Sequence, residues 1–422
     1  MTTVLMLLGT MALFMVIGVP ISLSLGAATL TTMLSFDVPI AVIGQRMFTA
    51  LDSVSIMAIP FFVLAGDLMA TGGISRRLCD FANRIVGNFR GGMAVAMIVA
   101  CALFSAVSGS APATVVAIGA IMYPEMVRLG YPPKRAAGLL AVAGGLGPII
   151  PPGIILVVYA TLTNCSVGDM FKSATVWGAL ITAVLIVMAI IYAHKEKWPK
   201  NSEKFSFAEL GKSFVDAIPA LLVPVVIFVG IFSGWMTPTE AAAASCVCAF
   251  VVGMFVYREL KWSDLVPILL NSSKNSAMVL FIIATSTAFS WLFTFSGASD
   301  QLVGFMTSVN FPPLLFVFVS CLILQFFGTF LEGIATAVLL VPVLWPIAAG
   351  LGVNVIHFGM VLSISNVIGT MDPPVAVDLF AASTVSKLKV GDIAWGELPF
   401  YIAFVIILWL SVFLPQISTF VL

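Results

Sequence analysis

Four carboxylates lie inside apolar stretches of this 422-residue chain: Asp67, Glu332, Asp372 and Asp378. Burying a charged side chain near the centre of a bilayer costs at least about 2.5 to 3.5 kcal/mol, so such residues usually have a partner or a task. We expect Glu332 and Asp372 to hold a cation. Asp378 would either line a substrate cavity or be protonated and hydrogen-bonded. Asp67, close to the end of its apolar stretch, is as well explained by snorkelling or capping as by function.

Hydroxyl groups gather where two further apolar stretches, 92–127 and 312–348, are interrupted by small or polar residues. A helix interrupted in a membrane leaves unpaired carbonyls that suit a small cation and unpaired amides that suit an anionic substrate. Oxygen ligands of this kind suit sodium, and neither interruption contains His or Cys. The alternative is that small residues there only allow close helix packing. The hydroxyl residues are Ser105, Ser108, Ser110 and Thr329.

A proline pair occurs twice, at 151–152 and 373–374, as part of a longer internal repeat. Aligning 113–160 with 335–382 without a gap gives eleven identities in forty-eight positions, where chance would give about four. Two corresponding apolar segments broken by Gly and Pro are typical of a secondary transporter whose site lies where the broken helices meet.

The elements that position these residues are two proline-broken helices, 136–163 and 354–383, and two re-entrant hairpins at 92–127 and 312–348. Non-helical backbone survives at membrane depth only when it is buried in protein or lines a cavity. Asn366 lies one turn before the second break, where it suits substrate binding, although hydrogen bonding in the core explains it almost equally well.

Composition places the chain in a bilayer: 61% of the residues are hydrophobic, 9% are charged and the mean hydropathy is +1.14. A net charge of zero argues against a nucleic-acid partner. The spacing of six cysteines without a C-x-x-C and of two distant histidines argues against a disulfide framework or a zinc site, and no signal peptide is evident. The predicted spans are 4–34, 53–71, 172–193, 214–233, 237–257, 275–296 and 399–420, besides the two broken helices.

The basic residues test this arrangement. If the hairpins do not cross the membrane, seventeen basic residues lie on one side and only Arg46 and Lys172 on the other. Such a bias predicts that the N-terminus is cytoplasmic and that the C-terminus, after nine crossings, lies outside. The residues 74–90, apolar on one helical face, are predicted to form an interfacial arm, with a solvated loop as the alternative.

These elements predict an all-α polytopic membrane protein made of two inverted-topology repeats. The first repeat covers 1–200 and the second covers 223–422. Residues 201–222 are assigned to an interfacial arm and the start of a connector helix at 214–233. Because an odd number of crossings separates the repeats, the two hairpins open from opposite sides.

Six motifs in the right order resemble the large membrane subunit of the tripartite ATP-independent periplasmic (TRAP) transporters, along essentially the whole chain. They are AIPFFVLAGDLM at 58–69, SGSAPA at 108–113, GGLGPIIPPG at 144–153, TPTEAAA at 237–243, GTFLE at 328–332 and N-x-x-IG-x-x-DPPVAVDLF at 366–380. The resemblance implies an elevator-type secondary transporter of the bacterial inner membrane that imports organic acids with a sodium gradient. It also implies two partners, a small four-helix membrane subunit on a separate chain and a periplasmic substrate-binding protein. The resemblance thus implies sodium as the coupling ion, and no other cofactor is expected.

The resemblance and the positions of the breaks together assign site residues. The ion-binding residues are Ser105, Ser108, Gly109, Gly147, Gly328, Thr329, Glu332, Gly369 and Asp372. The substrate-binding residues are Ser110, Pro151, Asn366, Thr370, Pro373 and Asp378. Where the family usually reads TPPVG followed by Asn, this chain has Asp372, Ala376 and Asp378. The extra carboxylates could strengthen a sodium site, signal proton coupling or shift preference toward a less anionic substrate.

Three alternative functions compete with this one. The competing transporter is a proton- or sodium-coupled carboxylate carrier of the same superfamily that needs no binding protein. An intramembrane enzyme is disfavoured, because no catalytic serine, metal or aspartate motif is present, so we expect no enzyme. A passive channel fits inverted, occluding hairpins less well than a carrier. Sugar acids, dicarboxylates, keto acids and sialic acids remain open as substrates.

Overall fold

A computed structural model describes residues 2–36, 38–86, 89–200, 206–373 and 376–422, and the described residues contain helices and no strand. The first half contains α1 (Thr2–Val16), α2 (Ile21–Ser35), α3 (Ala41–Leu51), α4 (Ala58–Thr71), α5 (Ile74–Val86), α6 (Gly92–Ser108), α7 (Ala111–Arg128), α8 (Pro133–Gly144), α9 (Ile154–Thr163) and α10 (Val167–Lys195). The second half contains α11 (Phe207–Phe232), α12 (Pro238–Val251), the π-helical turn η1 (Val252–Val256), α13 (Trp262–Phe295), α14 (Ala298–Ser308), α15 (Pro313–Gly328), α16 (Gly333–Gly350), α17 (Val355–Met371), α18 (Val377–Ser386), α19 (Val390–Phe413) and α20 (Pro415–Thr419). The predicted all-α class is confirmed.

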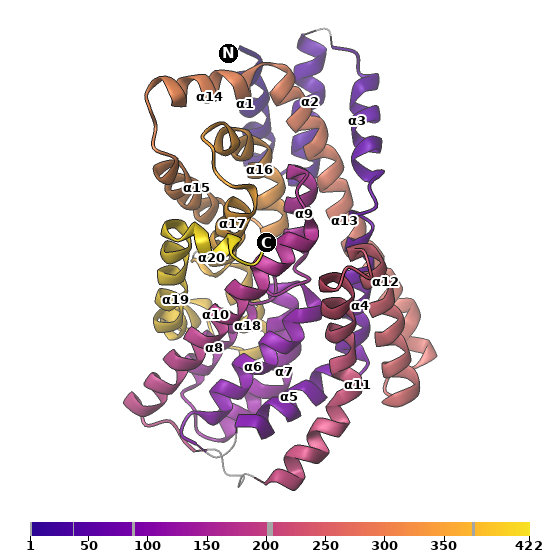
Figure 1. The fold of residues 1–422 in the computed structure, drawn as a ribbon, viewed down its shortest axis with the longest axis vertical. Helices are drawn as coiled ribbons and strands as arrows, with labels where there is room; N and C mark the ends of the chain where they lie inside the picture. The colour runs from indigo at the N-terminus through magenta and orange to yellow at the C-terminus, as the bar shows by residue number, and fades with distance from the viewer. Residues whose placement is uncertain (1, 37, 87–88, 201–205, 374–375) are drawn as a thin grey trace.

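The N-terminal apolar run does not form the single span predicted over 4–34. It forms two helices, α1 and α2, which are separated by a short break containing Gly18 and Pro20 and pack against each other. Gly18 takes a positive φ of 85°, and proline cannot continue the α1 hydrogen-bond ladder. The N-terminus therefore lies at the same end of the molecule as the end of α2, opposite α5 (Figure 1). The predicted count of nine crossings took this run as one span, and the number of crossings stays a prediction.

The predicted arm is helical. Helix α5 turns away from α4 by 70°, and its apolar face, including Ile74 and Leu78, is buried. Arg76 and Arg77 at its start pair with Glu259, which follows η1. The arm therefore connects the end of α4 to the turn before α13. Part of the predicted arm, 87–88, lies outside the described residues.

The hairpins and the broken helices are confirmed with bounds close to those predicted. Helices α6 and α7 form the first hairpin, in the lower half of the molecule, and α15 and α16 form the second, in the upper half (Figure 1). A shift of 222 positions carries the bounds of α7 onto those of α16. The sequence repeat thus corresponds to a structural repeat in which the hairpins approach from opposite ends.

The same shift of 222 positions also aligns helices for which the sequence predicted elements of different kinds. It brings α1 onto the end of α11, α2 onto α12 with η1, and the pair α3 and α4 onto the single long helix α13. Helix α11 packs on α12 as α1 packs on α2, and the predicted connector helix 214–233 lies within α11 and one residue beyond it. Residues 207–213, predicted as part of an arm, begin α11, while 201–205 lie outside the described residues. The division into domains at 200 and 223 remains a prediction.

The helices form two groups that contact each other through α13 and α16 and through α4 and α6. In one group α13 packs on α2, α3 and α4, and α4 also packs on α12. In the other group each hairpin packs on a broken helix, with α7 against α8 and α18 and α15 against α17. Six described helices are long and apolar enough to cross a membrane, namely α10, α11, α12 with η1, α13, α16 and α19. The other described apolar helices are shorter, and contacts with neighbouring helices hold them in position.

Helix α12 begins with a reciprocal cap that provides a first testable prediction. The Thr237 hydroxyl accepts a hydrogen bond from the Glu240 amide at 3.3 Å, and the Glu240 carboxylate accepts one from the Thr237 amide at 2.7 Å. Thr237→Ala removes half of this capping box, so we expect a loss of about 1 kcal/mol of stability. Thermal unfolding in detergent measures it. Thr307→Ala is the control, because that hydroxyl only contacts carbonyls of its own helix; equal losses in both variants would contradict the prediction.

Candidate functional site

A cavity of about 370 Å³ lies where the two hairpin tips and the two helix breaks converge. The first tip contributes Ser108, Gly109 and Ser110 to its wall, and the second contributes Glu332 and Gly333. The other helix group closes the cavity with Asp67 of α4 and with Asn275, Met278 and Val279 of α13. The cavity is therefore lined by both groups of helices, at their boundary.

The first tip is a tight turn between α6 and α7. Gly109 ends α6 with a left-handed φ of 60°, and a Cβ there would lie 2.7 Å from the Pro152 carbonyl oxygen, so only glycine fits. The hydroxyls of Ser108 and Thr114 lie 2.9 Å apart, and Thr114 also donates to the Ser110 carbonyl. The tip is thus fixed by its own hydroxyls and by contact with the first break.

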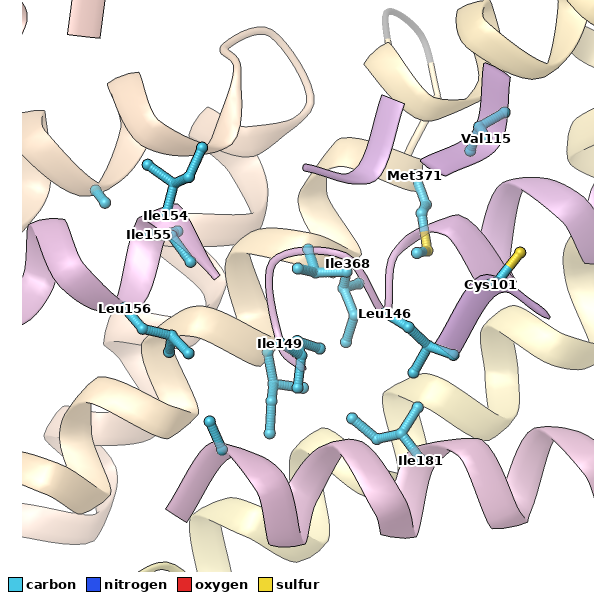
Figure 2. Packing of buried hydrophobic residues seen from close by; sticks show 14 of the residues in the cluster. Cys101, Val115, Leu146, Ile149, Ile154, Ile155, Leu156, Ile181, Ile368 and Met371 are labelled. Carbon is cyan, nitrogen blue, oxygen red and sulfur yellow. The ribbon is translucent and has the colours of Figure 1, made fainter. Parts of the chain in front are cut away.

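The first break, residues 145–153, passes directly beneath this tip. A Cβ on Gly147 would lie 2.6 Å from the carbonyl carbon and oxygen of Ser110. Side chains of α17 cover the other side, since a Cβ on Gly145 would meet the Met371 and Val367 side chains. Leu146 and Ile149 of this break and Ile368 and Met371 of α17 are among the buried apolar side chains of this region (Figure 2). The first break and the end of α17 therefore pack within the same buried apolar region.

The second hairpin is also contacted by a glycine of its broken helix, although at a different position of the hairpin. A Cβ on Gly369 of α17 would lie 2.8 Å from the Gly328 Cα atom, at the end of α15. Gly369 is the repeat counterpart of Gly147, so the same repeat position brings the broken helix against its hairpin in both halves. The Thr329 carbonyl accepts a hydrogen bond from the Ala376 amide at 3.2 Å, which ties the second tip to the far side of the second break.

On the cavity wall, Asn366 and Asp378 each have a side-chain oxygen without a hydrogen-bond partner among the described residues. The Asn366 amide nitrogen donates to the Gly333 carbonyl at 2.7 Å, which fixes the orientation of the amide and leaves its Oδ1 without a donor. Asp378 Oδ2 accepts from the Thr370 hydroxyl at 2.8 Å, while its Oδ1 has no partner. Both residues are 0% exposed, so these atoms are shielded from bulk water.

The structure brings some of the predicted site residues to the cavity wall and leaves others behind it. On the wall are Ser108, Gly109, Ser110, Glu332, Asn366, Thr370 and Asp378. Outside the described wall are Ser105, Gly147, Pro151, Gly328, Thr329, Gly369, Asp372 and Pro373. Of these, the glycines and Thr329 support the tips, and the buried Ser105 hydroxyl has no partner. Pro374, the second member of its pair, lies outside the described residues.

Three further polar side chains had no definite role predicted from the sequence. Asp67 accepts hydrogen bonds from Asn271 and Ser272 of α13 at 3.1 and 2.6 Å, so it joins α4 to α13 at the cavity rather than snorkelling. Asn275 is a wall residue that no motif singled out. Glu397 is a fifth membrane carboxylate, 3% exposed with Oε2 unpaired. It lies two residues before the predicted span 399–420. Helix α19 begins at Val390, so a predicted span with that start would have included Glu397.

The chemistry of the wall is that of an acceptor-rich site. It carries three carboxylates, Asp67, Glu332 and Asp378, and none of its described residues is Lys or Arg. Backbone and hydroxyl oxygens lie at both tips, and oxygen donors of this type suit hard cations. In the described part of the chain no group of three His, Cys, Asp or Glu residues could hold a metal ion by itself. A cation here would therefore depend largely on carbonyl and hydroxyl oxygens.

Paired hairpins and broken helices around one central cavity define a membrane transporter of the inverted-repeat type. Two solved structures share this fold: MtrF of Neisseria gonorrhoeae, described with a class of antimetabolite efflux pumps (TM-score 0.64, 14% identity, 90% of this chain and 85% of that one), and the YdaH transporter of Alcanivorax borkumensis (TM-score 0.63, 14% identity, 89% and 87%).

The family is more specific than the fold. Residues 8–417 match the family described as tripartite ATP-independent periplasmic transporter, DctM component, and the chain belongs to this family. The chain is 36% identical to the C4-dicarboxylate TRAP transporter large permease DctM of Rhodobacter capsulatus, over 98% of this chain and 97% of that protein. It is 33% identical to the sialic acid permease SiaM of Vibrio cholerae, over 95% and 94%. It is also 36% identical to the isethionate permease DctMQ of Oleidesulfovibrio alaskensis, over 98% of this chain and 65% of that protein.

Proposed function

We propose that this TRAP large permease imports a small organic acid together with sodium, after a periplasmic binding protein has delivered the substrate. The observation that supports this most is the convergence of both tips and both breaks on one cavity between the two helix groups. A site built from two inverted halves can face each side of the membrane in turn.

The movement we propose is of the elevator type. The hairpins and broken helices, α6–α9 and α15–α18, would move as one body against α2–α4 and α11–α13. The cavity lies on the boundary between these groups, with Asp378 on one side and Asp67 on the other. Ion binding at the tips would order Ser110 and Glu332, the two residues that precede α7 and α16, and so complete the substrate pocket.

The orientation and the partners belong to the same proposal. The positive-inside rule places the α5 end of the molecule in the cytoplasm, which now puts the N-terminus outside, unlike the sequence prediction. A small four-helix subunit on a separate chain would cover part of the lipid-facing surface. The alternative is a carrier that needs no binding protein. Substrate uptake that depends strictly on a binding protein, in vesicles reconstituted with bacterial inner-membrane lipids, would exclude this alternative.

Sodium coupling can be tested before the substrate is known. The purified chain is melted in detergent across sodium concentrations, with potassium or choline holding the ionic strength constant. We expect a sodium-specific rise in the unfolding midpoint, because a ligand at 100 times its Kd stabilises by about 2.7 kcal/mol. Glu332→Ala should blunt this rise, since Glu332 is the carboxylate at the second tip, and Asp372→Ala tests the second break.

The control is Glu125→Gln, which changes an exposed carboxylate that pairs with Arg128 at the end of α7, away from the cavity. It should keep the full sodium response. A wild-type midpoint that rises equally with sodium, potassium and choline would sink sodium coupling. If the unfolding midpoint instead depends on pH, and this dependence requires Asp378, protons are favoured as the coupling ion.

A further inference from the structure

The cavity wall also constrains the class of molecule that it would carry, if the proposed transport function holds. We propose that the substrate is a small zwitterion, with an ammonium group at one end and a carboxylate or sulfonate at the other, rather than a dicarboxylate. The volume of about 370 Å³ lies near the lower end of the roughly 300–1,000 Å³ typical of small-molecule sites, so the molecule is small.

The unpaired atoms on the wall require a donor. Asn366 Oδ1 and Asp378 Oδ1 are acceptors without partners, on side chains that are fully buried. An unsatisfied buried acceptor is costly, and an ammonium group supplies up to three N–H donors. A dicarboxylate at neutral pH brings only further acceptors and would leave both atoms unpaired.

The charges on the wall point the same way. Asp67, Glu332 and Asp378 are the acidic residues among the described lining, and no basic residue accompanies them. The basic residue next in sequence to a wall residue is Lys274, which is exposed and is not part of the lining. A dianion would add two negative charges to a wall that already carries three carboxylates. A positive group near Asp378 lowers this repulsion instead.

The anionic end has a separate place to bind. Helix α7 is 18 residues long, has no acidic residue in its first turn, and begins at Ser110 and Ala111 on the wall. Its dipole and the amides of Ala111 and Ala113 suit a carboxylate, while Pro112 between them has no N–H. The opposing helix α16 begins directly after Glu332, which makes its start less suitable for an anion. The wall is thus divided into an anion-accepting side and a cation-accepting side.

The test compares zwitterions and dicarboxylates of matched chain length. Thermal unfolding of the full chain is followed at constant sodium with β-alanine against malonate, 4-aminobutyrate against succinate, and 5-aminovalerate against glutarate. We expect at least one zwitterion to raise the midpoint by about 3 °C while its dicarboxylate partner does not. Asp378→Asn, which keeps an acceptor for Thr370, should weaken the apparent affinity for that zwitterion at least about tenfold.

Asp300→Asn is the matched control, because Asp300 is exposed on α14 and lies outside the cavity wall. A dicarboxylate that stabilises as well as its partner zwitterion would overturn the inference, as would no response to any zwitterion. In both cases an intact sodium response would leave the proposed transport function standing. If Asp378→Asn blunts only the sodium response, the unpaired atoms serve sodium and the zwitterion inference fails. Should Asp378→Asn not fold, the wild-type pairs alone decide.

Discussion

Gly138→Ala is expected to leave little folded protein. Helices α8 and α19 cross with their backbones in direct contact, and a Cβ on Gly138 would lie 2.2 Å from the Glu397 amide nitrogen and 2.4 Å from the Gly396 carbonyl carbon. From the other helix, a Cβ on Gly396 would lie 1.9 Å from the Lys134 carbonyl oxygen. Backbone cannot move aside as a flexible side chain can, so the two helices would have to separate.

Overpacking of a well-packed core commonly costs about 1–3 kcal/mol, and we expect Gly138→Ala to reach at least the upper end because both partners are backbone. The measurement is the yield of monodisperse protein in detergent together with its unfolding midpoint. Gly391→Ala is the matched control on α19, where a Cβ would meet nothing within 4 Å. It should be neutral or stabilise by about 0.5–1 kcal/mol. Similar yields from both variants would show that the α8–α19 crossing is looser than described.

Gly147→Ala is the second large effect, and it should act on transport more than on folding. The added methyl group would press on the Ser110 carbonyl, 2.6 Å away, and displace the first tip from the cavity. Because Ser108, Gly109 and Ser110 all line the wall, we expect a loss of at least about 100-fold in sodium-dependent uptake. A misplacement of about 1 Å in a binding constellation commonly has an effect of this size.

Uptake by reconstituted vesicles with the wild-type partners measures this effect, and the sodium-dependent shift of the unfolding midpoint gives a second readout that requires no substrate. Gly304→Ala on α14 is the control, since a Cβ there would meet nothing within 4 Å. Gly369→Ala, at the repeat counterpart, should behave like Gly147→Ala, because its Cβ would meet the Gly328 backbone. Normal uptake in Gly147→Ala would rule out a role for this contact in holding the tip.

Local sequence signals were sufficient for the hairpins and the broken helices. Glycine, proline and small polar residues interrupt the apolar stretches at the tips and at the breaks, and helices must end near such residues whatever they pack against. The predicted first hairpin, 92–127, therefore differs by one residue from the observed end of α7 at Arg128. The repeat spacing of 222 also placed the second hairpin and break correctly.

The N-terminal region shows where local signals were insufficient. Residues 4–34 are apolar throughout, and hydropathy does not distinguish one long tilted helix from two short antiparallel ones. Gly18 and Pro20 marked the break, but the packing of α2 on α13 decides that the chain turns back there. The second repeat shows the same limit. Helices α3 and α4 are separated by a break near Asp52, whereas their repeat counterpart α13 is one continuous helix of 34 residues.

The sequence by itself determined the membrane class, the inverted repeat, the two tips and the residue types that gather there, because these depend on composition and on backbone breaks. Only the tertiary structure decided which of those residues face the cavity. Ser105 and Ser108 lie less than one helical turn apart, yet Ser108 lines the wall and Ser105 does not. Asp67 and Asn275 are distant in sequence and meet at the cavity because α4 packs on α13. Orientation of a side chain depends on which helix lies opposite, and no local pattern carries that information.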